Sequence, residues 1–215
     1  LKYSEKRELS FFAVMKKLIL KTIFITCGIA LMLLFAVFGI VSLWAPSAMM
    51  NFTASLGMET VSGDYAFQEY ERSGNISCLA RSFLIASRHK DDRNADQRFE
   101  ILFGLEGFGE FCESQNTSGE GVPAVSYRSY LCGQAAEVKY RLAKTAEEKE
   151  AVCSFAVEET TADFPSGNPV IALTLALAEA KDATASDILL TKISGKGFEQ
   201  NPDYRNIINI LEAVE

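Results

Sequence analysis

The chain has 215 residues, of which 48% are hydrophobic, and its 28 acidic and 21 basic side chains give a formal net charge of −7. The charges are unevenly distributed, because residues 22–58 contain no Asp, Glu, Lys or Arg. Soluble domains average about 25% charged residues, so this stretch excludes a purely soluble single domain. The acidic balance of the rest argues against a nucleic-acid partner, since phosphate binding needs clustered Lys and Arg.

The first predicted element is a membrane-spanning helix. Residues 22–43 carry no charge, and at about 1.5 Å per residue such a helix covers about 33 Å, more than the roughly 30 Å hydrocarbon core of a bilayer. A helix is the only single segment that pairs all its backbone N–H and C=O groups in lipid. Trp44 lies where an interfacial aromatic residue is expected, and Pro46 follows as a helix stop. We predict a transmembrane helix over residues 18–44; a buried core helix is the alternative, against which the length argues.

The basic residues around this span predict its orientation. Three lysines lie close before the charge-free stretch, and no basic residue follows it until Arg72. These lysines are Lys16, Lys17 and Lys21. The positive-inside rule then makes residues 1–17 a basic cytoplasmic stub and residues 45–215 the extracytoplasmic domain of a single-pass protein of the cell membrane.

A cleaved signal peptide is the rival interpretation of the same segment. Signal peptides usually have an apolar region of about 7–15 residues that ends in an A-x-A-like site. Here the apolar run is longer, and Pro46 interrupts the nearest run of small residues. The chain begins with Leu1, whereas Met15-Lys16-Lys17-Leu18 resembles a bacterial start, so Met15 is a candidate native start. An uncleaved anchor is expected with either start.

The stretch that follows the span is more apolar than spanning requires. Within residues 42–58, Ala48, Phe52 and Leu56 lie at roughly helical spacing. We expect an amphipathic helix here that either packs on the outer domain or lies on the membrane surface.

The remaining chain predicts an all-α domain. Apolar residues recur at helical spacing, and no run alternates with a period of two for long. Residues 113–123, rich in Gly and Ser, form the clearest loop. The predicted helices cover residues 61–73, 76–88, 94–111, 124–143, 145–160, 168–181, 184–193 and 202–213.

A repeat is indicated within residues 168–202. Asn168-Pro169 recurs as Asn201-Pro202, and a helix–turn–helix lies between them with its turn at Lys181-Asp182. Helical hairpins of this size stack into superhelical arrays, in which each hairpin buries its apolar face on its neighbour. Ser73-Gly74-Asn75, between two other predicted helices, is a second and poorer copy of the turn.

This hairpin resembles the tetratricopeptide family, although the Trp-x-x-Leu-Gly signature is missing. Aligning Lys181-Asp182 with the family's Gly-Asp turn places apolar or small residues at the packing positions of both helices. These residues are Leu173, Ala176 and Leu177 on the first helix and Ser186 and Leu190 on the second. The resemblance implies a tetratricopeptide-like solenoid that follows the transmembrane helix; amphipathic hairpins without a family relationship are the alternative.

No pattern in the chain predicts catalysis. His89 is the only histidine, which excludes a His-based triad or a two-His metal site within one chain. Glu147 and its neighbours and Glu158-Glu159 form acidic clusters, which on amphipathic helices are normally a solvated face. Gly104, Gly107 and Gly109 lack the preceding strand and following lysine of a phosphate loop. We expect no catalytic, cofactor-binding or metal-binding residues.

Four cysteines lie beyond the span, at spacings that match no C-x-x-C zinc or redox motif. They are Cys78, Cys112, Cys132 and Cys153. In an oxidising exterior they could form two disulfides, but each falls in a predicted helix beside apolar neighbours. Free cysteine commonly serves there as a small core residue, so we favour structural thiols over disulfides.

These features favour a membrane-anchored helical-repeat protein that serves as a protein–protein interaction or scaffold module in the bacterial envelope. The Met-Lys-Lys start points to a bacterium, and arrays of this kind bind protein partners through their concave faces. The main alternative is a membrane-anchored enzyme whose carboxylates come together only in three dimensions. A structural or sensory domain whose partner contacts the span is a third.

Overall fold

The computed structural model describes the backbone at residues 2–119, 122–161 and 167–214, and the side chains at residues 15–116, 126–161 and 167–214. The chain divides into two compact units, residues 1–49 and residues 50–215. We call the second unit the helical domain and describe each unit by itself.

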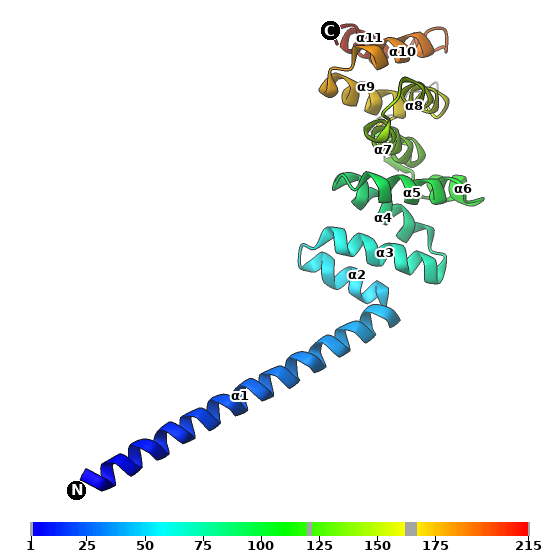
Figure 1. Ribbon diagram of the computed structural model, residues 1–215. Coiled ribbons are helices and arrows are strands. Elements are labelled where there is room, and N and C mark those ends of the chain that lie inside the picture. The colour runs from blue at the N-terminus through cyan, green and yellow to red at the C-terminus, as the bar shows by residue number, and fades with distance from the viewer. Residues whose placement is uncertain (1, 120–121, 162–166, 215) are drawn as a thin grey trace. The chain divides into compact units, whose positions relative to one another are not determined.

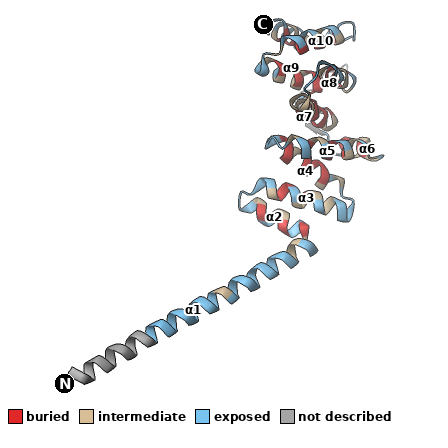
Figure 2. Cartoon of the chain, viewed as in Figure 1, coloured by how far each residue is buried: buried red, intermediate tan, exposed pale blue. Residues whose placement is uncertain are grey.

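The first unit is dominated by one long helix, α1 (Lys2–Trp44). From Met15 to Trp44 it is long and apolar enough to cross a membrane, and its described side chains are nearly all exposed (Figure 2). The hydroxyls of Thr22, Thr26 and Ser42 each donate to the carbonyl oxygen four residues earlier, at 2.8–3.0 Å. These polar groups are therefore satisfied within the helix, as lipid requires. The backbone of the predicted stub continues the same helix, and the side chains of residues 1–14 lie outside the described residues.

A short helix, α2 (Pro46–Ser55), follows α1 after a single residue, Ala45. Proline is favoured in the first turn of a helix because its missing N–H would have no partner there. The amphipathic segment predicted after the span is thus helical. It crosses the boundary between the two units.

Nine further helices and one short strand pair are described in the helical domain, and the helices succeed one another in chain order (Figure 1). They are α3 (Glu59–Ser73), α4 (Ile76–Arg88), α5 (Asp92–Phe103), α6 (Phe108–Gln115), α7 (Tyr127–Leu142), α8 (Ala146–Glu158), α9 (Pro169–Ala180), α10 (Ala183–Ile193) and α11 (Pro202–Glu212). The prediction of an all-α fold is confirmed.

One predicted helix and one predicted loop need correction. Residues 94–111 are two helices, because the chain leaves helical conformation after Phe103 and resumes it at Phe108, with Gly107 as N-cap. The predicted loop over residues 113–123 contains the end of α6 and a short antiparallel pair. Its strands are β1 (Thr117–Gly119) and β2 (Val122–Val125).

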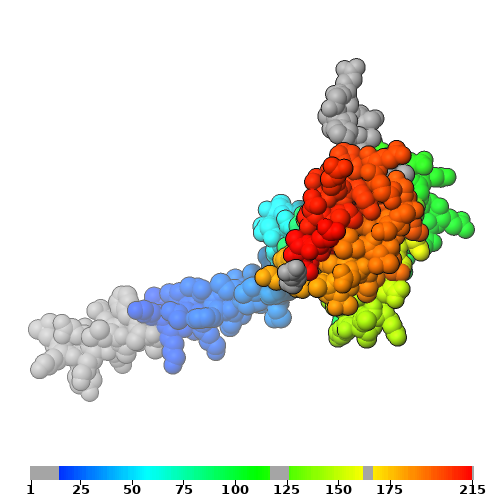
Figure 3. Space-filling view, turned by 90° about the horizontal axis from the view of Figure 1, so that it is seen from above, coloured from blue at the N-terminus to red at the C-terminus, as the bar shows by residue number. Residues whose placement is uncertain are grey.

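Packing between helices is local along the chain, as expected of an array of helical hairpins. α3 packs on α4, α4 on α5, and α5 on α7. Farther along, α7, α9 and α11 contact one another in sequence as one row, while α8 packs on α10 beside it. Seen from the C-terminal end, the orange and red side chains of α9, α10 and α11 form one continuous face (Figure 3).

Three inter-helix turns share one conformation. Gly74-Asn75, Lys90-Asp91 and Lys181-Asp182 each place a left-handed residue, with φ of 69°, 58° and 52°, directly before the N-cap of the next helix. At two of these turns the cap side chain accepts a backbone N–H, from Ser77 at 3.0 Å and from Ala185 at 3.1 Å. A left-handed residue ends one helix and a short polar side chain starts the next, so the turn is encoded locally.

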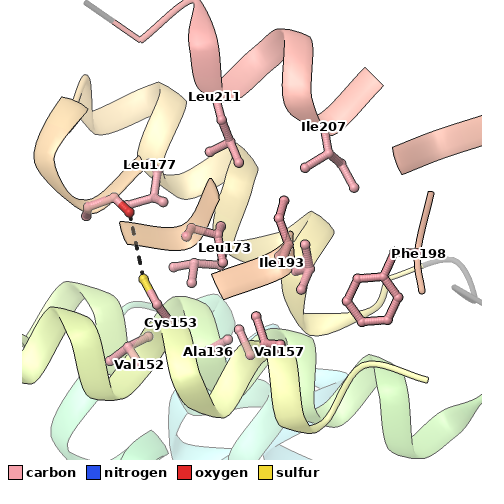
Figure 4. Packing of buried hydrophobic residues seen from close by; sticks show 14 residues of the cluster. Ala136, Val152, Cys153, Val157, Leu173, Leu177, Ile193, Phe198, Ile207 and Leu211 are labelled. Carbon is pink, nitrogen blue, oxygen red and sulfur yellow. Dashed lines mark hydrogen bonds between the residues drawn. The ribbon is translucent and has the colours of Figure 1, made fainter. Parts of the chain in front are cut away.

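The buried apolar residues form two clusters that divide the domain along its length. The first lies among α4, α5, α6 and α7, and includes Phe83, Phe99 and Leu131. The second lies among α7 to α11, where Leu173, Leu177 and Ile193 are fully buried (Figure 4). Burial of one such side chain contributes about 1.5–3 kcal/mol to stability.

Of the positions aligned with tetratricopeptide packing sites, Leu173, Leu177 and Ser186 are buried, and Ala176 and Leu190 are half-buried. All five positions are therefore at least half-buried in the hairpin. Asn168 and Asn201 are the N-caps of α9 and α11, each followed by proline in the first turn.

Candidate protein-binding groove

An open groove of about 520 Å³ lies between α5, α7 and α8. We call it the aromatic groove, because phenylalanines of α5 and α8 line its apolar part. The lining residues are Asp96, Phe99, Glu100, Phe103, Lys139, Leu142, Ala143, Glu148, Ala151, Val152 and Phe155. On α5, Phe99 and Phe103 are four residues apart, as are Asp96 and Glu100, so one side of a single helix carries both an apolar and an acidic row.

The aromatic rings of the groove contact one another across two helices. The ring centroids of Phe99 and Phe103 are 5.4 Å apart, and Phe155 of α8 meets Phe99 edge-to-face at 6.0 Å and Phe103 at 6.2 Å. Edge-to-face pairs of this kind add about 0.5–1.5 kcal/mol beyond the area they bury. The three rings therefore form a stable apolar floor, in which Phe103 and Phe155 are only half-buried.

Lys139 of α7 connects this floor to the acidic row. Its Nζ donates to Asp96 Oδ1 at 3.0 Å and to Glu100 Oε1, and it lies 5.8 Å from the ring centroid of Phe99 and 5.7 Å from that of Phe155. Burial by itself lowers the pKa of Lys139, but the hydrogen bonds to Glu100 and Asp96 outweigh it and hold the pKa above its ordinary value. The ammonium group therefore stays charged and cannot serve as a base near neutral pH.

A second cation, Arg128, contacts Phe103 of the floor from outside the groove lining. Arg128 Cζ is 5.5 Å from the ring centroid of Phe103 and 5.3 Å from that of Phe108. Its guanidinium donates to Glu159 Oε2 at 2.8 and 3.1 Å. Arg128 and Lys139 thus each make cation–π contacts with two phenylalanine rings. Carboxylates balance the charges of both cations.

The rim on the α8 side carries Glu148, which forms a capping box with Thr145. Its carboxylate accepts the backbone N–H groups of Lys144 at 2.6 Å and Thr145 at 2.9 Å. These backbone hydrogen bonds lower the pKa of Glu148. The rim carboxylate is therefore ionised and fixed in place by the helix start.

Four of the eleven residues that line the groove are charged. Its lining combines an apolar floor with three carboxylates and one ammonium, an excess of negative charge. Among the described lining residues there is no Ser, Thr, Cys, His or Tyr that could act as a nucleophile. Within the part of the chain that the structure describes, no group of three His, Cys, Asp or Glu side chains could hold a metal ion.

The four cysteines beyond the span are free thiols located outside this groove. Cys112, Cys132 and Cys153 are buried and Cys78 is half-buried. Burial raises the pKa of Cys112 and of Cys153 to about 11. The Cys153 Sγ donates to the carbonyl oxygen of Ala185 at 3.8 Å and points from α8 toward α10 (Figure 4).

Side chains of the acidic clusters identified in the sequence have separate partners in the structure. Glu159 pairs with Arg128, Glu150 pairs with Lys192 at 3.1 Å, and Glu148 caps its own helix. His89 follows the end of α4, where its Nε2 lies 3.0 Å from Glu59 Oε2. The structure brings none of these groups into one site.

Sequence reasoning missed the residues that define the groove. The signal that could have found one wall is the paired i, i+4 spacing of Asp96 with Glu100 and of Phe99 with Phe103. The other wall, with Lys139 and Phe155, comes from helices about 40–60 residues farther along the chain, and no local pattern links it to α5.

No family model, curated protein or solved structure matches the chain. The helical array and the groove are therefore supported by the geometry of this structure alone.

Proposed function

We propose that the chain is a single-pass, membrane-anchored protein whose helical domain binds another protein through the aromatic groove. In this proposal the N-terminus is cytoplasmic, the helical domain is extracytoplasmic, and the protein acts as an interaction or scaffold module of a bacterial envelope. The apolar part of α1 and the lysines on its N-terminal side support the anchor and its orientation.

The observation that carries the binding function is the aromatic floor, in which Phe103 and Phe155 are half-exposed, beside an acidic rim. An open apolar surface with a few fixed polar groups is the usual composition of a binding site. The rim carboxylates Asp96, Glu100 and Glu148 outnumber the single cation Lys139. Charge complementarity therefore selects a partner segment with an apolar anchor side chain next to Lys or Arg.

We also propose a distant relationship to the tetratricopeptide family. The support is the shared turn at Gly74-Asn75, Lys90-Asp91 and Lys181-Asp182 and the repeated Asn-Pro helix starts. The local packing of successive helices is the arrangement that such repeats adopt.

The binding proposal is tested with two synthetic amphipathic peptides, one of Leu and Lys and one with Glu in place of every Lys. The full chain is placed in phosphatidylcholine nanodiscs, whose neutral lipid adds no electrostatic attraction for the basic peptide, and fluorescence anisotropy measures binding above that to empty nanodiscs. We expect the Leu/Lys peptide to bind and the Leu/Glu peptide not to bind. Ala151→Lys, an exposed groove position, should weaken binding on the order of tenfold, equivalent to about 1.4 kcal/mol.

The matched control is Ala180→Lys, which adds the same charge at an exposed position of α9 outside the groove lining. It should leave the dissociation constant unchanged. Equal affinity for the two peptides, or equal loss in both variants, would show that the groove does not select this ligand.

A further inference from the structure

Exposed apolar side chains are concentrated at one place in the helical domain. Beyond α1, the described large hydrophobic side chains that are exposed are Phe52 at 50%, Leu56 at 58%, Met58 at 46% and Leu175 at 56%. Three of these four lie in α2 and in the turn that follows it. We call Phe52, Leu56 and Met58 the apolar patch. A contiguous exposed patch marks an interaction surface, whereas a single exposed residue such as Leu175 needs no explanation.

α2 contacts α3 through Met50, and Phe52, Leu56 and Met58 remain exposed. Ser62 of α3 is buried and its Oγ donates to the carbonyl oxygen of Met50 at 2.9 Å. Thr53 is also buried. Phe52 and Leu56 are four residues apart and so lie on the same side of the chain. The sequence left open whether this segment packs on the domain or lies on the membrane, and the contact with α3 leaves Phe52 and Leu56 exposed.

Chain connectivity limits how far the patch can be from a bilayer that α1 crosses. Only Ala45 separates α1 from α2, and a ten-residue helix is about 15 Å long. The headgroup layer on each side of the hydrocarbon core is itself about 5–8 Å thick. No charged residue occurs between the span and Glu59, so no ionised side chain within that segment opposes contact with the lipid.

We infer that the apolar patch inserts into the interfacial layer of the membrane leaflet from which the helical domain emerges. This inference rests on the anchor in the proposed function, and it is independent of the aromatic groove. The segment contains no Lys or Arg, so the contact is with the acyl and neutral headgroup region and does not depend on anionic lipid. The patch thereby restricts the orientation of the helical domain on the membrane.

The test uses the single tryptophan of the chain, Trp44. The full-length variant W44F/F52W moves it into the patch, and W44F/L175W moves it to the exposed residue on α9 as a matched control. Each protein is reconstituted in phosphatidylcholine liposomes, and brominated phosphatidylcholine is added as a quencher that acts from within the bilayer. We expect the patch tryptophan to be quenched several-fold more than the control tryptophan, and equally when part of the lipid is anionic.

A further variant tests the patch as a unit. Adding Leu56→Asp to W44F/F52W should remove most of the quenching without changing the far-ultraviolet circular dichroism spectrum. If Phe52→Trp disturbs folding, W44F/L56W provides the same measurement from the neighbouring patch residue.

Quenching at Trp44 tests the membrane anchor, and quenching at the patch position tests the insertion of the patch. In the unmodified protein Trp44 itself should be quenched by brominated lipid. Quenching at Trp44 combined with patch quenching no greater than at the control position would overturn the inference and leave the anchor intact. Absence of quenching at Trp44 would refute the anchor and the inference together.

Discussion

Asp182 shows how one side chain stabilises a helix start and an inter-helix contact at once. Its carboxylate accepts hydrogen bonds from Lys149 Nζ at 2.5 Å, from Tyr140 Oη at 2.9 Å and from the backbone N–H of Ala185 at 3.1 Å. Burial raises the pKa of Asp182, but these three hydrogen bonds outweigh it, so the pKa lies below its ordinary value. The carboxylate therefore joins α7, α8 and α10 as an anion.

We predict that Asp182→Asn destabilises the protein near neutral pH by about 1–3 kcal/mol, since hydrogen bonds to a charged group are lost. A carboxyl group with a depressed folded pKa stabilises fully above its unfolded pKa of about 3.9. This contribution disappears as the pH falls through the folded pKa. Urea unfolding of the detergent-solubilised chain at several pH values should show the difference from wild type shrink below about pH 4.

The matched control for this experiment is Asp187→Asn, an exposed position on the same helix, α10. It should change stability little at any pH. A constant difference between wild type and Asp182→Asn across the whole pH range would contradict an ionised, hydrogen-bonded carboxylate.

At the scale of the element, the helix starts could be predicted because their signals are local. Thr145, Asn168 and Asn201 each cap the helix that they precede, and short polar side chains at these positions satisfy backbone N–H groups that have no partner in the helix. The apolar periodicity of each helix is equally local. The break between α5 and α6 was missed because apolar residues continue at a spacing of three through Leu102, Leu105 and Phe108, although the chain turns between the two helices.

The groove could not be predicted in the same way. Lys139 and Asp96 are 43 residues apart, and their contact depends on how α7 packs on α5. The left-handed Lys90 was also missed, since lysine has no intrinsic preference for positive φ. Local sequence patterns therefore do not predict which helices contact one another, because those contacts depend on packing.

The packing around α7 leads to a prediction about Gly133. A Cβ at this position would lie 2.3 Å from the carbonyl oxygen of Gly167, in the segment that leads into α9. A backbone atom cannot move aside as a flexible side chain can, so we expect Gly133→Ala to destabilise the domain by about 1–3 kcal/mol. Denaturant unfolding followed by circular dichroism measures this change.

Gly109→Ala on α6 is the matched control, because a Cβ there meets no atom within 4 Å. Alanine is the better helix former by up to about 1 kcal/mol, so this variant should be as stable as wild type or slightly more stable. Equal stability of the two variants would show that α7 does not approach the segment before α9 this closely.

At the scale of the whole molecule, the charge-free stretch of the sequence corresponds to two helices with different surroundings. α1 contains the apolar span, and α2 follows it directly with one face on α3 and one exposed apolar face. The domain beyond them carries the acidic charge of the chain, which an anionic membrane does not attract. The proposed membrane contact therefore depends on α1 and the apolar patch.

The proposed binding of a partner protein in the aromatic groove has a direct test. It is tested by photo-crosslinking in living cells that express the full chain with a benzophenone amino acid at Lys144. This exposed residue lies next to Ala143 and Glu148 of the groove lining. The same amino acid at Leu175, exposed on α9, is the control. Mass spectrometry identifies the captured peptides.

We predict crosslinks from position 144 to a segment that combines an apolar side chain with Lys or Arg, and few crosslinks from position 175. Glu100→Lys, which reverses a largely exposed rim charge, should reduce the yield from position 144 on the order of tenfold, about 1.4 kcal/mol in binding free energy. Equal yields from both positions, or a yield from position 144 that Glu100→Lys leaves unchanged, would contradict the account.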